Sequence, residues 1–238
     1  MNTCRLPKSG LRAFTLVELI AVMAIIILIG TFVAPSAATL LRGSQVTQAS
    51  QILTDQLSLA RQEALSRSTP IEVRFLRFAD PEAGGETAGL PSSGKFRAIE
   101  LMEVTPGGRT LPLKDSRVIM LPNSVMMNPN KTFSSLISVD SGTPPKTPTA
   151  SDVALPRNIG RNYDYVSFRF LQNGSTDLLS SSTTAPTDGG TADYFVTIHA
   201  ITDQPKLTSN TDLKKINFFT LVVDAVSGGT KGYRPNAL

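Results

Sequence analysis

The sequence has few of the residues that cross-link or catalyse: one cysteine, Cys4, and one histidine, His199. A single cysteine excludes an intramolecular disulfide and a thiolate metal site, so the core alone must hold the fold together. Cys4 also comes before the first apolar run, whereas lipidation needs a cysteine after one. His199 has no candidate partners for a metal site or a catalytic triad, and no G-x-S-x-G motif occurs. We therefore expect a structural or surface role for His199, no cofactor, no metal and no enzymatic activity.

The chain also has little charge imbalance once its first residues are set aside. The formal net charge of the 238 residues is +4, which alone would suggest a nucleic-acid or membrane-surface partner. Arg5, Lys8 and Arg12 lie before the first apolar run with no acid among them, and the rest of the chain carries 20 basic and 19 acidic residues. The positive balance is therefore mostly the cytosolic flank of a membrane segment.

Residues 14–34 form an apolar run of bilayer-spanning length, which for a helix is roughly 20 residues. The run contains one acid, Glu18, and a carboxylate at the centre of a bilayer costs about 2.5–3.5 kcal/mol. Glu18 lies near the start of the run, so we expect it close to the headgroups, where the cost is smaller. The run predicts a transmembrane helix over 14–34 whose carboxylate needs a partner.

Residues 35–69 continue the helix as an amphipathic segment. Apolar residues step by three and four along one face: Val46, Ala49, Leu53, Leu57, Ala60 and Ala64. The helix ends before Pro70, because the residue preceding a proline disfavours the α conformation. We predict one helix over roughly 15–68, with a local weakening at Pro35, which lacks a backbone donor.

From Pro70 onward the apolar period becomes two, beginning with Ile71, Val73 and Phe75. Further segments have strand composition: 97–104, 117–121, 133–139, 163–171, 194–201 and 216–223. Residues 70–238 are therefore predicted to form a β-rich head, an antiparallel sheet packed against the long N-terminal helix in an α+β fold. Loops rich in Pro, Gly, Ser and Thr are expected to face away from the core: 79–94, 141–157 and 180–192.

Two glycine-containing pairs predict hairpins within the sheet. Gly107-Gly108 would close one of them. Asn173-Gly174 is the stronger signal, because a two-residue hairpin loop needs positive φ at both central positions and both residue types accept it.

The segment Ala13-Phe14-Thr15-Leu16-Val17-Glu18-Leu19, with a basic leader before it and an apolar helix after it, resembles a prepilin of the type IV pilin superfamily. In that family a membrane peptidase cuts before the phenylalanine, and the new amine is usually N-methylated. The resemblance implies a cut between Ala13 and Phe14 that removes a cytosolic leader, 1–13, although the family usually has glycine where this chain has Ala13. It also implies that Glu18 pairs with a neighbouring subunit's terminal amine, and that Pro35 lets the helix bend during assembly.

Later segments resemble the GspH/FimT group of minor pseudopilins of type II secretion systems and minor pilins. The strongest likeness covers 53–76, and weaker ones cover 165–174 and 222–235. The size and the loop-rich insert also resemble the pilin-like Verru_Chthon cassette protein D group. These resemblances imply a type IV pilin-like fold and a structural subunit of a type IV pilus or type II secretion-like pseudopilus. Its partners would be other pilin or pseudopilin subunits, the prepilin peptidase and the inner membrane, with the head in the periplasm or at the fibre surface.

Two other interpretations of the N-terminal segment remain open. A secretory signal peptide fits the basic flank and the small residues Ser36-Ala37-Ala38, but the apolar core is too long for one and contains Glu18. An ordinary single-span anchor explains the length of the run but not the sequence from Phe14 to Glu18.

Three short patterns elsewhere have simple interpretations. Gly89 to Phe96 nearly matches a phosphate-binding loop, but Phe96 stands where a metal-bound hydroxyl is needed, so a surface loop is expected. Asp188 and Asp193 lie in a glycine-rich loop that suits Ca²⁺, yet two acids are too few to specify a site. Asn130 and Asn173 open matches to a glycosylation pattern that short sequences meet by chance.

Lys231 and Arg234 form the most basic local feature near the C-terminal end. Some minor pilins of the FimT type bind DNA through basic residues near this end, so the resemblance offers a second function, a tip subunit that binds DNA or another ligand. Two charges on a near-neutral domain predict weak and salt-sensitive binding, and a solvated tail is the simpler interpretation.

Overall fold

The computed structural model describes residues 15–82, 84–113, 117–138, 144–178, 194–207, 209–213 and 215–234, and the side chains of 30–40 are outside that description. The chain divides into two compact units, Met1–Leu41 and Arg42–Leu238. Its helices are α1 (Leu16–Arg67), η1 (Pro91–Ser93), η2 (Ile201–Lys206) and α3 (Asn210–Leu213). Its strands are β1 (Ile71–Phe78), β2 (Lys95–Val104), β3 (Thr110–Pro112), β4 (Ile119–Met120), β5 (Val125–Met127), β6 (Tyr163–Phe170), β7 (Tyr194–Ala200), β8 (Phe218–Val223) and β9 (Thr230–Tyr233).

The helix α1 has nearly the bounds that the sequence predicts. It begins directly after Thr15 and ends at Arg67. Ser68 then takes a left-handed conformation, with φ of 53°, and Pro70 leads into β1. The chain thus leaves the helix through a left-handed residue, a common way to terminate one, and Pro70 prevents its continuation.

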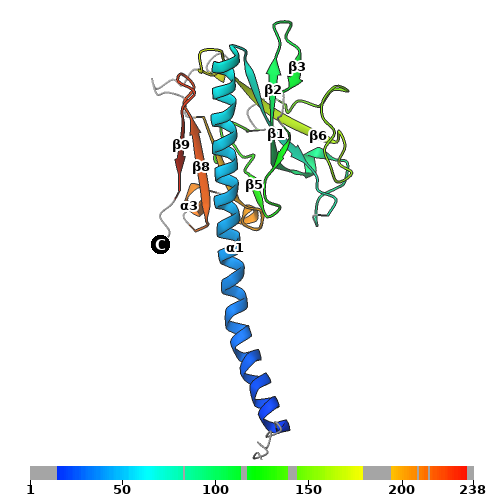
Figure 1. Ribbon diagram of the computed structural model, residues 1–238, viewed down its shortest axis with the longest axis vertical. Coiled ribbons are helices and arrows are strands. Elements are labelled where there is room, and N and C mark those ends of the chain that lie inside the picture. The colour runs from blue at the N-terminus through cyan, green and yellow to red at the C-terminus, as the bar shows by residue number, and fades with distance from the viewer. Residues whose placement is uncertain are drawn as a thin grey trace, which may run out of the picture. The chain divides into compact units, whose positions relative to one another are not determined.

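The described strands form one antiparallel sheet in the order β6-β1-β2-β5-β7-β8-β9, with β3 and β4 also paired to β2 (Figure 1). β1 lies between two long partners, because Val73 faces Leu101 of β2 and Phe168 of β6. The strands predicted at 97–104, 163–171, 194–201 and 216–223 are confirmed as β2, β6, β7 and β8. The one predicted at 117–121 is confirmed only as the two-residue β4.

The residues of α1 from 42 to 67 lie across one face of this sheet (Figure 1). The six apolar residues that the sequence placed on one helix face are all buried, none more than 1% exposed: Val46, Ala49, Leu53, Leu57, Ala60 and Ala64. They share one core with alternate residues of β1, β2, β7 and β8, including Phe75, Ile99, Val196 and Leu221. The predicted fold class, a long N-terminal helix packed on an antiparallel sheet, is therefore confirmed.

The strand predicted at 133–139 is wrong over 133–138, which form turns. Serine side chains replace a regular ladder here: Thr197 N–H donates to Ser134 Oγ and Phe195 N–H donates to Ser135 Oγ, each at 3.0 Å. Leu136 N–H donates to the Phe195 carbonyl at 3.0 Å. The segment thus follows β7 through hydroxyl groups, which an apolar strand pattern does not indicate.

The predicted turn at Asn173-Gly174 exists, but its type is different. Leu171 N–H donates to Ser175 O and Gly174 N–H donates to Leu171 O, both at 2.8 Å. Gly174 has φ of 78°, whereas Asn173 is absent from the residues of positive φ. This is a three-residue loop in which a turn is followed by one left-handed glycine, the second common hairpin geometry. The turn at Gly107-Gly108 has the same pattern.

The loop predicted at 141–157 faces solvent over most of its described residues, as expected, but Asp152 and Leu155 are buried. We call residues 144–162 the outer flap. Its Leu155 and Ile159 pack in a second apolar cluster with Leu76 and Phe78 of β1. These β1 residues alternate with Val73 and Phe75, which face the helix, so the outer flap covers the opposite face of the sheet.

The packing of α1 on the sheet predicts an asymmetric effect of two neighbouring leucines. Leu57 is fully buried, whereas Leu59 is 38% exposed on the same helix. We expect Leu57→Ala to lower the free energy of unfolding by about 2–5 kcal/mol, because it leaves a cavity. We expect Leu59→Ala to change it by about 0.5 kcal/mol or less. Urea unfolding of the detergent-solubilised full chain, followed by circular dichroism, measures both, and equal losses would contradict the observed packing.

Candidate functional site

The first turn of α1 contains a reciprocal capping arrangement between Thr15 and Glu18. Thr15 N–H and Thr15 Oγ1–H each donate to Glu18 Oε2 at 2.9 Å, and Glu18 N–H donates to Thr15 Oγ1 at 3.3 Å. This is a capping box, in which the N-cap and the third helical residue each satisfy the other's free backbone donor. Both donors use Oε2, so among the described residues Glu18 keeps Oε1 for a further partner.

The following turns of α1 expose an unusual amount of apolar surface. Large apolar side chains between Leu16 and Ile29 are 47–74% exposed on all sides of the helix. Apolar surface of this extent normally marks contact with another protein or a membrane. No helix in the part of the chain that the structure describes is long and apolar enough to cross a membrane.

Two predicted site residues of the N-terminal region lie outside the described residues, namely Ala13 and Phe14. Pro35 lies within the bounds of α1, and its side chain is not described. The cleavage at Ala13 and Phe14 and the role of Pro35 therefore stay predictions, as does the span predicted over 14–34.

The two basic residues near the C-terminal end have different surroundings. Lys231 lies on β9 and is exposed. Arg234 Nη1 donates to Thr47 Oγ1 of α1 at 2.9 Å, so this guanidinium is used within the head. Both side chains of the predicted pair are thus exposed, and Arg234 differs in being hydrogen-bonded to the helix.

His199 is completely buried on β7. Its Nδ1 lies 2.7 Å from the Ala200 carbonyl, which can only accept, so Nδ1 carries the proton. Its Nε2 then accepts from Asn128 Nδ2 at 3.0 Å. Burial lowers the pKa of His199, and the hydrogen bond to Ala200 only partly opposes it. The structural role expected for His199 is therefore confirmed.

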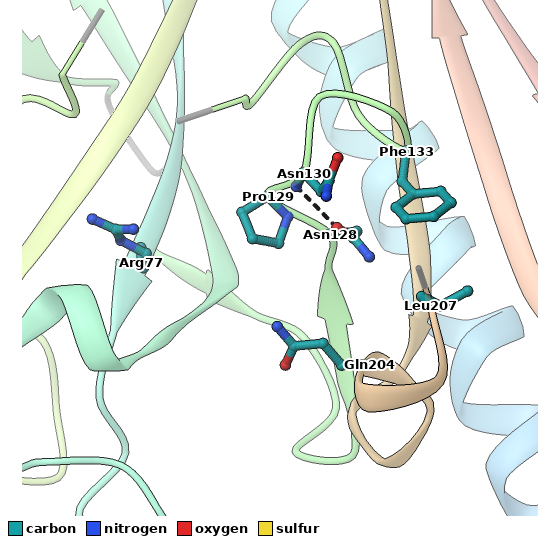
Figure 2. Close-up of a pocket in the computed structure, with 7 residues that line it drawn as sticks. All are labelled: Arg77, Asn128, Pro129, Asn130, Phe133, Gln204 and Leu207. Atoms are coloured by element: carbon teal, nitrogen blue, oxygen red, sulfur yellow. Dashed lines mark hydrogen bonds between the residues drawn. The ribbon is translucent and has the colours of Figure 1, made fainter. Parts of the chain in front are cut away.

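A pocket of about 380 Å³ lies beside Asn128, the hydrogen-bond partner of His199 (Figure 2). Its lining is Arg77, Asn128, Pro129, Asn130, Phe133, Gln204 and Leu207. Most of its polar groups already have partners: Arg77 binds Asp164 through both Nε and Nη2, and Asn128 Oδ1 accepts from Asn130 N–H. No nucleophile and no free base stands among these seven described residues, so the pocket has the character of a polar recess and not of a catalytic centre.

The near match to a phosphate-binding loop is a surface loop, as expected. Residues Pro91–Ser93 form the short helix η1, and Lys95 and Phe96 begin β2, so no helix follows the lysine. Lys95 Nζ donates to Glu86 Oε1 at 3.1 Å. The candidate calcium loop at Asp188 and Asp193 lies outside the described residues.

A buried cluster of charged side chains lies between the sheet and the outer flap. Arg74 Nη1 is 2.7 Å from Asp152 Oδ1 of the outer flap, and Arg74 Nε is 3.0 Å from Glu72 Oε1. Glu100 of β2 is farther away, with Oε2 at 3.8 Å from Arg74 Nη1. All four residues are at most 3% exposed. Arg74 fills the centre, and no metal-binding group of three His, Cys, Asp or Glu lies among the described residues.

Glu100 is the member of this cluster whose negative charge is least well compensated. Neither of its carboxylate oxygens has a hydrogen-bond partner within the described part of the chain. Burial raises the pKa of Glu100 most, Arg74 lowers it in part, and the charges of Asp152 and Glu72 raise it, so that the pKa lies at about 7. For Asp152, burial favours the neutral form, but the bonds from Arg74 and Thr149 outweigh it and leave its pKa below the ordinary value. Glu100 therefore changes its charge near neutral pH while Asp152 stays ionised.

One weak signal for this cluster is present in the sequence. Glu72 and Arg74 occupy the alternate face of a strand whose other face is apolar, a pattern that usually means solvent exposure. Their burial depends on Asp152, 78 residues from Arg74 in sequence. The alternation of charged residues can be seen in the sequence, but the segment that buries them, the outer flap, cannot.

The comparisons with known proteins give a distant likeness among solved structures. No family model matches the chain, and no curated protein matches it. Among solved structures, the chain is similar to the minor pseudopilin EpsH from the type 2 secretion system of Vibrio cholerae. The alignment covers 81% of this chain and 99% of that chain, with 9% identity and a TM-score of 0.39. Values this low carry no argument about function, so the proposals below rest on this chain's own residues.

The geometry around His199 predicts its protonation state. We expect neutral imidazole with the proton on Nδ1 at pH 6, where an ordinary histidine, with a pKa of about 6.5, is mostly protonated. Because the folded state binds this proton less readily than the unfolded state, stability falls as the pH drops below about 6.5. Nitrogen-15 spectra contain a single imidazole, since the chain has one histidine. The urea-unfolded chain is the control, and a doubly protonated ring in the folded protein at pH 6 would refute the assignment.

Proposed function

We propose that this chain is a structural subunit of the minor pilin or pseudopilin type, in a type IV pilus or a type II secretion-like pseudopilus. The observation that carries the proposal is the combination of Glu18 with the exposed apolar side chains behind it on α1. An apolar helix with one acid in its first turn suits a segment that first lies in the inner membrane and then packs among like helices. It does not suit a helix that stays in water.

The apolar surface between Leu16 and Ile29 supports assembly because it must be covered in the working state. Transfer of such side chains out of water contributes about 25 cal/mol for each Å² buried. Lipid tails would cover them before assembly, and the helices of neighbouring subunits would cover them in the fibre. The prepilin peptidase and the other subunits are accordingly the partners we propose.

Glu18 would then have two successive partners. In the subunit its Oε2 accepts from Thr15, which satisfies donors that a helix start otherwise leaves free. After cleavage before Phe14, a neighbour's new amine could approach Oε1. A carboxylate and an ammonium group that meet in an apolar surrounding offset much of each other's desolvation cost.

The head would form the periplasmic or fibre-surface part of the subunit. The alternative of a DNA-binding tip subunit has less support, because the basic pair supplies only two exposed cations, one of which, Arg234, is hydrogen-bonded to Thr47.

Processing gives the first test of the proposed function. We expect the mature protein, purified from membranes, to begin at Phe14 with a methylated amine. Peptide mass spectrometry of its N-terminus measures this directly, and the peptidase-deficient strain is the control. A mature start at Thr39 would identify a secretory signal peptide and overturn the proposal.

Two substitutions of Glu18 separate its capping role from the proposed pairing. We expect Glu18→Leu to insert into the membrane but to reduce assembly strongly, because it has neither an acceptor nor a charge. Glu18→Gln keeps an acceptor for Thr15 but cannot form an ion pair, so we expect it to assemble poorly as well. Membrane fractionation and shear release of filaments measure the two steps. Normal assembly of Glu18→Gln would show that charge pairing is not required.

A further inference from the structure

The outer flap is held on the sheet by few attachments. Its backbone pairs with β6 only at Lys146, through bonds of 2.8 and 2.9 Å with Tyr165. Tyr163 Oη–H donates to the Val153 carbonyl at 3.0 Å. Further contacts are the apolar side chains of Leu155 and Ile159, the ion pair between Asp152 and Arg74, and a bond from Lys146 Nζ to Ser167 Oγ at 3.0 Å. Arg157 Nη1 also lies 3.3 Å from Asn123 Oδ1 and 3.6 Å from Asp80 Oδ2. The flap therefore depends on side chains more than on a backbone ladder.

The flap also contains a strained turn. Arg157 and Asn158 both have φ of 58°, and Gly160 has φ of 60°. Ile159 N–H donates to the Pro156 carbonyl at 3.3 Å, which closes a turn with two left-handed central residues. Asparagine accepts this conformation readily, but an arginine with a Cβ does so at a cost. Closure of the flap must offset that cost.

The charged side chains beneath the flap affect the stability of its closed position. The groups near Glu100 come from three elements: Glu72 and Arg74 of β1, Tyr163 and Tyr165 of β6, and Asp152 of the flap. Arg74 is the buried cation of this cluster, and its shorter contacts go to Asp152 and Glu72. Arg169 of β6 reaches Glu72 Oε2 at 3.6 Å from a side chain that is 41% exposed. Arg74 Nη1 lies 3.8 Å from Glu100 Oε2, so the charge of an ionised Glu100 is only partly compensated.

We propose that the outer flap is a proton-operated latch, closed over β1 and β2 while Glu100 is protonated and loosened when Glu100 ionises. An ionised Glu100 gains water only if the flap lifts, since its two oxygens have no hydrogen-bond partner beneath it within the described residues. Loosening exposes the outer face of β1 and β2, including Leu76 and Phe78, which the flap otherwise covers. This inference does not depend on the proposed function.

The sign of the effect follows from the two states of Glu100. The closed state binds the proton more tightly than the open state, where the carboxyl is solvated, so rising pH favours opening. With a pKa of about 7 when closed and about 4.5 when open, the opening equilibrium rises about tenfold between pH 6 and pH 8.5 and then levels off.

Hydrogen exchange of the full-length protein tests the latch. Exchange of peptides from the outer flap is measured between pH 6 and pH 8.5 and corrected for the intrinsic rate, with helix peptides covering 46–60 as the internal reference. We expect protection of the flap to fall about tenfold over this range in the wild-type chain and to stay constant in Glu100→Gln. Glu103→Gln is the matched control, because Glu103 lies on the same strand but pairs with Arg67, and it should behave like the wild type.

Three outcomes overturn the proposal. One is constant protection of the wild-type flap, and another is a pH dependence that persists in Glu100→Gln. The third is protection of the flap equal to that of the helix peptides at every pH, which means that the flap opens only by global unfolding. If Glu100→Gln does not fold, carbon-13 titration of the Glu100 carboxyl in the wild-type protein decides. An ordinary pKa near 4.5 would then refute the latch.

Discussion

The contact between one face of α1 and one face of the sheet is the constraint on which the rest of the head depends. Small residues at Ala49, Ala60 and Ala64 let the helix backbone come close to the strands, while Leu53 and Leu57 fill the space between them. A helix can cover only one face of a sheet, so the opposite face of β1 and β2 needs a different cover. The outer flap supplies it, and the charges on that face become buried as a result.

The spacing of apolar residues predicted those elements whose structure depends on residues close together in the sequence. The buried face of α1 follows from steps of three and four, and the long strands follow from alternation. The strands β3, β5 and β9 were missed because three or four residues are too few to establish a period. The outer flap was missed for a different reason: its composition is that of a loop, and its burial depends on Arg74, 78 residues before Asp152. Glu18 was found as a site, but the Thr15–Glu18 capping box was overlooked although its spacing is a known helix start signal.

The capping box reduces the free-energy cost of an ionised Glu18 at the start of an apolar helix. A carboxylate that already accepts from Thr15 is not an unsatisfied group, so its tolerance near an apolar helix has a local cause within the subunit. If a neighbour's amine binds during assembly, the gain is only the difference between the new contacts and those kept with Thr15. Such an exchange is favourable mainly where water is excluded, because an ion pair strengthens as the local dielectric falls. Pairing and burial of the helix would therefore be coupled.

The distribution of charge in the head also explains why its basic residues say little about a ligand. Arg77 is bound to Asp164, and Arg97 lies against Glu86 and Asp80, as Arg74 lies against Asp152. These guanidinium groups are neutralised inside the fold, where each also fixes the position of a loop or strand. A net charge counted from the sequence includes both members of each pair, so pairing by itself leaves the net charge unchanged. Pairing does reduce the number of guanidinium groups that can bind a polyanion, because a basic residue contributes to binding only where no acid inside the chain already holds it.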